Sequence, residues 1–350
     1  MRVPRKKKLL LGAVSAACAL PALALAQAPA GVEIYGRANV SYERITVTNA
    51  PTDWEVVDNS SRIGFRGKKD LGDGLSAFFQ IESRVRLDNG GDTFSSRDSY
   101  LGMSGGFGTA RVGRTIGPVY YATYDYISNH NHDTGNSSDA LLALAIFGNQ
   151  GFMNNTVWYT SPKMGAFTVD VAYSRLGEAR AAPGMSQPSY MGLVGAYDQG
   201  PLHVAVSHAE TKNSADLGGG IGNKDTATTI GGLYNFGGKV IVGALYEKAK
   251  SDQLVGDTQR DYFRVSVMVP VAKHEFHVNL GMVDDRLDVN MADAGAKQYT
   301  LAYNYNVTKE FKLYAFYTVV DNEDNGNYGF KTNVAGIDNK SFAVGARYNF

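Results

Sequence analysis

The feature that most constrains this chain is an alternation of apolar and polar residues that returns along most of its length. In residues 32–43 the even positions are apolar or small and the odd positions are mostly polar or charged. The same alternation marks residues 75–87, 167–174, 240–246, 263–269, 276–282 and 299–305. Because successive side chains of a β-strand point to opposite faces, each segment is predicted to be a strand between two different environments.

The connectors between these segments alternate in length. Tight ones occupy residues 70–74, 105–108, 198–200, 237–238 and 270–272, and longer polar ones occupy residues 49–60, 88–95, 177–187, 210–224, 248–259, 284–297 and 321–339. Short turns at one rim and long loops at the other are typical of an up-and-down transmembrane barrel. We count about 16 strands, an even number as such a barrel requires.

A soluble β-sandwich is the alternative, because alternation also marks half-buried strands. Two observations favour the membrane barrel. Tyr and Phe crowd the apolar face near strand ends, as an interfacial aromatic girdle does. The polar face carries charges in mid-strand, such as Arg84 and Arg86, which a packed sandwich core could not bury unpaired. The predicted fold is therefore all-β, a 16-stranded antiparallel transmembrane β-barrel.

The N-terminus predicts export. Five basic residues between Arg2 and Lys8 precede an apolar run that ends in a small-x-small site at residues 24–26. This order is typical of a secretory signal peptide over residues 1–26, and residues 27–350 are expected to form the barrel. A membrane anchor and a lipoprotein are alternatives, but the run is short and Ser15 stands where a lipoprotein usually has Leu before Cys18. The longest later apolar run, residues 140–147, is too short to span a membrane as a helix.

Charge and cysteine content exclude several kinds of chemistry. Residues 1–26 carry five basic and no acidic residues, so their removal leaves 29 Lys and Arg against 34 Asp and Glu. This mildly acidic balance gives no reason to expect a nucleic-acid partner. Cys18 is the only cysteine, so disulfides and thiolate metal sites are excluded after cleavage. We expect no cofactor and no metal.

The C-terminal strand carries a more specific signal. Phe342, Val344, Ala346, Tyr348 and Phe350 occupy every second position, and Phe350 is the final residue. This arrangement resembles the terminal strand that the outer-membrane assembly machinery recognises. Tyr348 and Phe350 are the predicted assembly signal, and the machinery is a predicted partner.

The whole chain after residue 26 is similar to the general-diffusion porins of β-proteobacteria, the group that includes neisserial porins. The resemblance lies in residues 32–37, 61–67 with 70–74, 105–114, 159–162 and 347–350. It implies an outer-membrane channel for passive diffusion of ions and small hydrophilic solutes. It also implies a homotrimer in contact with outer-membrane lipids and lipopolysaccharide, and a third loop folded into the pore.

That third loop is expected at about residues 117–155, a length that is unusual in a compact barrel and normally functional. The predicted constriction sets its acidic residues against arginines of the wall: Asp125, Asp133 and Asp139 facing Arg37, Arg62, Arg66, Arg84, Arg86, Arg97, Arg111 and Arg114. Alternation directs the first five arginines to the lumen, and the family resemblance implies the same for the last three. A basic wall opposite an acidic loop makes a transverse field, which favours polar solutes and predicts a weak anion preference. The alternative is that each arginine only solvates the wall or anchors the loop.

One departure limits that preference. Family members commonly carry an arginine shortly before the Asn-x-Val-x-Tyr-x-Ser-Pro stretch, whereas residues 152–155 are Phe-Met-Asn-Asn. Without that cation, strong anion selectivity is not expected.

Other chemistry has weaker support. His130 and His132 lack a third ligand at metal-binding spacing, and His274 and His277 lie on opposite faces of one strand. An outer-membrane barrel enzyme would need a nucleophile with a His base, and the sequence shows no such group, so no catalytic residue is predicted. A plugged, adhesin-type barrel would need a plug, for which only the third loop is long enough.

Overall fold

The computed structural model describes residues 31–127, 141, 152–177, 186–213, 224–252, 258–284, 292–332 and 334–350. The expected signal peptide, residues 1–26, lies outside the described residues. So does much of the expected third loop, except for its two ends and Leu141.

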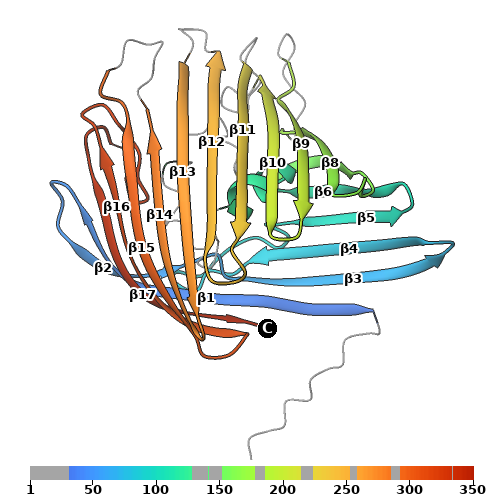
Figure 1. Cartoon of the computed structure of the whole chain (residues 1–350), viewed down its shortest axis with the longest axis horizontal. Helices are drawn as coiled ribbons and strands as arrows, with labels where there is room; N and C mark the ends of the chain where they lie inside the picture. Colours follow the sequence, from blue (N-terminus) through green and yellow to red (C-terminus); the bar gives the residue numbers. More distant parts are fainter. Residues whose placement is uncertain are drawn as a thin grey trace, which may run out of the picture.

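All strands belong to one antiparallel sheet that closes on itself, because β1 pairs with β17 as well as with its neighbours in sequence (Figure 1). The strands are β1 Val32–Val47, β2 Asp53–Asp58, β3 Arg62–Gly72, β4 Leu75–Arg84, β5 Ser99–Gly105, β6 Gly108–Thr115, β7 Met153–Thr160, β8 Phe167–Arg175, β9 Ser189–Gln199, β10 Leu202–Lys212, β11 Lys224–Asn235, β12 Ile241–Asp252, β13 Thr258–Val271, β14 His274–Val283, β15 Ala296–Asn306, β16 Phe311–Asn322 and β17 Asn339–Asn349.

The 17 segments make 16 positions around the barrel. Both β2 and β3 pair with β1, β2 against its second half and β3 against its first, so together they occupy one position interrupted at residues 59–61. The prediction of a 16-stranded antiparallel barrel is confirmed. The expectation that residues 49–60 are all loop is wrong, because β2 lies within them and continues the pairing with β1.

The two faces of the wall differ as the alternation predicts. Large exposed apolar side chains lie on the outer face, and most buried polar ones lie on the inner face. Aromatic pairs gather on the outer face at the end with the short turns: Phe167 with Tyr197 at 4.8 Å, Tyr234 with Phe236 at 4.5 Å and Phe276 with Tyr303 at 5.4 Å between ring centroids. Such a belt is where amphipathic rings meet a membrane interface.

The barrel closes where its two terminal strands meet. The Gly36 amide donates to the Phe350 carbonyl at 2.8 Å, and the Phe350 amide donates to the Gly36 carbonyl at 3.1 Å. The Phe350 ring covers Gly36 so closely that a Cβ at Gly36 would stand 2.3 Å from it. No helix among the described residues is long and apolar enough to cross a membrane.

Candidate pore constriction

The first part of the loop between β6 and β7 lies against the inner wall. It contains the π-helix η1, Tyr120–Asp125, which is the green coil beside β10 in Figure 1. The Ala122 carbonyl lies 2.8 Å from His203 Nε2 on β10. Five residues later in the loop, the Ile127 carbonyl accepts a 2.5 Å hydrogen bond from Ser266 Oγ on β13. These contacts hold the described segment inside the barrel.

Glycines on the inner face make room for this segment. A Cβ at Gly243 would lie 2.2 Å from the Ile127 carbonyl oxygen, and one at Gly231 would lie 2.2 Å from Ile127 Cδ1. A Cβ at Gly281 would lie 3.2 Å from Leu141. Gly231, Gly243 and Gly281, on β11, β12 and β14, together form what we call the glycine seat. Ile127 and Leu141 are almost fully buried there.

The segment and the opposite wall enclose a cavity of about 370 Å³. Three predicted arginines line it from the wall side: Arg37 on β1, Arg62 on β3 and Arg97 in the connector before β5. Asp125 lines it from the loop, together with Tyr120 and Tyr121. The structure thus brings four predicted residues together at one place. It adds Glu82, Asp98 and Phe152, which were not predicted as site residues.

Arginines and a glutamate form ion pairs on the wall side of this cavity. Glu82 lies 3.7 Å from Arg62 Nε and 2.5 Å from Arg97 Nε, and it accepts a 3.0 Å hydrogen bond from the Tyr35 hydroxyl. The charges that act on Arg37 include Arg62, Arg347, Arg97 and, with the opposite sign, Asp125. Cations therefore outnumber the carboxylates that neutralise them on this wall.

Asp98 and Tyr121 join the connector before β5 to the loop. The Tyr121 hydroxyl donates to Asp98, and the Ile116 amide donates to the same carboxyl at 3.2 Å. Burial raises the pKa of Asp98 above its ordinary value and raises the pKa of the Tyr121 phenol well above its own. These contacts fix the start of the loop to the wall beside the cavity.

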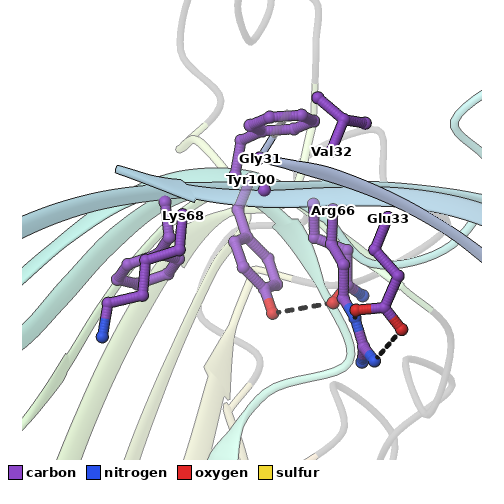
Figure 2. Close-up of a pocket in the computed structure, with 10 residues that line it drawn as sticks. Gly31, Val32, Glu33, Arg66, Lys68 and Tyr100 are labelled. Atoms are coloured by element: carbon purple, nitrogen blue, oxygen red, sulfur yellow. Dashed lines mark hydrogen bonds and ion pairs between the residues drawn. The ribbon is translucent and has the colours of Figure 1, made fainter. Parts of the chain in front are cut away.

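Three predicted arginines on β3, β4 and the next connector do not line this cavity. Arg84 pairs with Asp58 and Arg86 with Asp92, each at 3.8 Å. Arg66 makes two hydrogen bonds, of 2.8 and 2.5 Å, to Glu33. That pair lines a second cavity of about 540 Å³ with Lys68 and Tyr100, as Figure 2 shows. These arginines meet carboxylates from neighbouring strands or connectors, which offset their charge.

Arg111 and Arg114 on β6 also have partners of their own. The Arg111 guanidinium lies 3.9 Å from the ring centroid of Trp158 and 5.5 Å from that of Tyr100. Arg114 donates to the Ser96 carbonyl at 3.1 Å and to the Asn154 side chain. It lies two residues after the outward-facing Val112 and therefore on the same face of β6. Gly113 has a φ of 154°, and the pairing of β6 with β7 shifts register there.

Sequence reasoning missed two cations on the inner wall. Arg347 on β17 and Lys312 on β16 lie directly opposite one another and continue the row that Arg37 and Arg62 begin. Lys312 Nζ lies 3.6 Å from Glu275 on β14. The alternation that identified Tyr348 and Phe350 as outward-facing also places Arg347 on the other face, so the signal was present. We call Lys312, Arg347, Arg37, Arg62 and Arg97 the basic row.

Other predicted residues are not tested by these contacts. Asp133, Asp139, His130 and His132 lie outside the described residues. His274 and His277 lie on opposite faces of β14, the first bonded to the Tyr303 hydroxyl and the second beside Asn304. In the part of the chain that the structure describes, no group of three metal-ligating side chains is found.

The family described as Gram-negative porin matches residues 13–325. The chain is 28% identical over 314 residues to outer membrane porin protein 32 of Delftia acidovorans, covering 83% of this chain and 85% of that protein. It is 26% identical over 343 residues to major outer membrane protein P.IB of Neisseria lactamica, covering 95% and 86%.

Two solved structures are also similar. An anion-selective porin from Comamonas acidovorans has a TM-score of 0.76 at 25% identity and covers 91% of this chain and 99% of that one. The trimer form of OmpT from Vibrio cholerae has a TM-score of 0.66 at 19% identity, with coverage of 91% and 99%. The second likeness concerns the fold alone.

Proposed function

The chain belongs to the Gram-negative porin family and forms a channel in the outer membrane, and we propose that this channel passes ions and small hydrophilic solutes by passive diffusion with a weak preference for anions. The observation that carries the proposal is the cavity between Arg37, Arg62 and Arg97 on the wall and Asp125 on the loop. We propose this place as the pore constriction, with residues 117–127 as part of the narrowing loop.

The arrangement supports selection by charge and polarity. A solute between a row of guanidinium groups and a carboxylate meets a field across the pore, so a polar solute gains energy by orienting and an apolar one does not. The basic row adds positive charge along the wall, which raises the local concentration of anions. Glu82 and Glu275 offset part of that charge, because each lies within 4 Å of a member of the row.

The similar protein from Comamonas acidovorans is described as anion-selective, which agrees with this sign. The residues at the loop base, Phe152 to Asn155, supply no cation, so we expect the preference of this chain to be weak. The family is one of channels, and this sets aside the alternative of a barrel enzyme.

We also propose that the chain is exported by residues 1–26, assembled through its terminal strand, and present as a homotrimer. The trimer form of the Vibrio cholerae protein shares this fold and supports the last point. Conductance steps in groups of three from the reconstituted protein, with a crosslinked species of three chains, are the expected results.

Reversal potentials in a salt gradient test the selectivity. We would compare the wild type with Arg37→Gln, Arg62→Gln and Arg97→Gln in planar bilayers. Removing one charge about 4 Å from a permeating ion changes its energy by about 1 kcal/mol in water. We therefore expect the permeability to anions to fall by about fivefold at low salt, and the anion-to-cation permeability ratio to fall by at least that factor. The control is Arg66→Gln, which also removes one positive charge, because Arg66 lines the second cavity and not the proposed constriction.

Two outcomes would contradict the proposal. Unchanged reversal potentials in all three variants would show that the basic row does not set selectivity. Absence of current from protein shown to be folded and inserted would indicate a plugged barrel and favour the adhesin alternative.

A further inference from the structure

His203 connects the narrowing loop to the barrel wall. It faces inward from β10 and is 5% exposed. Its Nδ1 lies 2.7 Å from Asp198 Oδ1 on β9, and its Nε2 lies 2.8 Å from the Ala122 carbonyl oxygen in η1. One imidazole ring therefore bridges a wall strand and the loop.

The two partners determine the protonation state in which both contacts exist. A backbone carbonyl accepts hydrogen bonds and donates none, and so does an ionised carboxylate. Each ring nitrogen must therefore carry a hydrogen, and only the imidazolium has both. A neutral ring can keep one of the two contacts and must place a bare nitrogen against the other oxygen.

The surroundings of the ring add few other charges. Asp198 is directly opposite His203 in the pairing of β9 with β10, and Leu233 is opposite it on β11. From the loop, the Tyr126 ring lies 4.0 Å away between centroids. Asp198 and the Tyr126 phenol are thus the titratable groups that the described residues bring against the ring. When His203 is protonated, it is the positively charged group in this set of three.

We propose that protonated His203 is a positioning residue that holds the η1 part of the narrowing loop against β10, so that the width of the pore at η1 depends on pH through this contact. The inference rests on the proposed function of residues 117–127 as part of the constriction. At low pH the bridge is complete and η1 is held in place. As the pH rises and the ring loses a proton, the remaining hydrogen stays on Nδ1 beside the Asp198 carboxylate, so the hydrogen bond from Nε2 to the Ala122 carbonyl in η1 is lost.

The size of the effect follows from the kind of bond that is lost. Hydrogen bonds to charged groups contribute more than neutral ones. Losing one is expected to shift the ratio of held to released loop by about tenfold or more. An ordinary imidazole changes charge near pH 6.5, so a pH series on both sides of that value can detect the change.

The test uses the full mature protein in lipid bilayers, with single-channel conductance and current noise recorded between about pH 4.5 and 8.5. In parallel, imidazole nitrogen signals are followed by NMR, with His203 assigned by the signal that His203→Gln removes. In the wild type we expect noise and conductance to rise with pH, with a midpoint equal to that of the His203 titration.

Three variants separate positioning from simple structural support. His203→Gln keeps a polar side chain but cannot carry the charge, so it is expected to show the high-pH behaviour at every pH. Asp198→Asn introduces a carboxamide that can donate to a neutral ring, so it is expected to show the low-pH behaviour at every pH. The matched control is His208→Gln, because His208 lies on the outer face of the same strand, bonded to Thr228. It should behave as the wild type.

The inference is overturned if the wild type and His203→Gln have the same pH profile, or if His203 titrates without any change in current. Neither result would touch the proposed function. A change in permeability ratio on Arg62→Gln is measured independently of the loop's pH response. Conversely, a channel without charge selectivity whose conductance still changes with the His203 titration would contradict the selectivity proposal and support the role of His203.

Discussion

At the scale of single residues, the barrel depends on places where a side chain is missing. Gly36 accommodates the ring of the final residue, and Gly231 and Gly243 accommodate Ile127 of the loop. In each case a Cβ would stand less than 2.5 Å from a neighbouring atom. The close approach of another residue, rather than an unusual backbone angle, explains these glycines.

Gly36→Ala is expected to destabilise the barrel. The added methyl would lie 2.3 Å from the Phe350 ring and 2.7 Å from the Arg62 carbonyl oxygen. The ring can move but the backbone cannot, so we expect a loss of about 1–3 kcal/mol, typical of overpacking. Thermal unfolding in detergent micelles measures it. Gly195→Ala is the control, because nothing lies within 4 Å of a Cβ there, and an equal loss in both variants would refute the explanation.

Single residues also show how far sequence reasoning extends. Alternation predicts the inward direction of Arg37 and Arg62, because side-chain direction in a strand is a local property. It cannot predict that Arg84 meets Asp58 or that Arg111 lies on Trp158. Those partners come from other strands, and the register that joins them is set by the whole sheet. The sequence therefore predicts which face of the wall a side chain points to, but not which side chain of another strand it contacts.

At the scale of elements, the loop after β6 is positioned by the strands it lies on. The sequence predicts the loop from its length. The glycine seat could not be predicted, because β11, β12 and β14 are distant in sequence and each contributes a single glycine. The sequence likewise predicts a loop at β2, because this strand has only six residues and an aspartate at each end. A strand can be predicted when its own residues alternate between apolar and polar. The glycine seat cannot, because no single strand contains more than one of its three glycines.

Gly243→Ala is expected to release the loop from its seat. The added methyl would stand 2.2 Å from the Ile127 carbonyl oxygen, in the position that Ile127 occupies. Overpacking of about 1–3 kcal/mol would multiply the released population by about tenfold. Single-channel recordings should show higher and noisier conductance while thermal stability of the barrel changes little. Conductance identical to that of Gly195→Ala would show that the seat does not hold the loop.

At the scale of the whole molecule, closure turns separate strands into one charged wall. The basic row runs from β16 through β17, β1 and β3 to the connector before β5, and it crosses the junction between the two ends of the chain. Neither half of the sequence contains the row by itself. Its field is a property of the closed ring.

Anion preference is therefore expected to decrease with salt. The screening length is about 10 Å at 0.1 M ionic strength and about 3 Å at 1 M. A solute near the middle of the pore feels most of the row in the first case and only adjacent charges in the second. Reversal potentials measured at a constant concentration ratio should approach zero as total salt rises. A permeability ratio independent of salt would mean that direct binding, and not the field of the row, selects anions.

The pairing of β1 with β17 determines when the barrel can close. Phe350 is synthesised long after its partner Gly36, to which two backbone hydrogen bonds join it. No intermediate length of chain can complete the ring, however much of the sheet has already formed. Until β17 pairs with β1, the sheet is therefore an open ribbon with two unsatisfied edges, and the step that makes it a channel waits for that pairing.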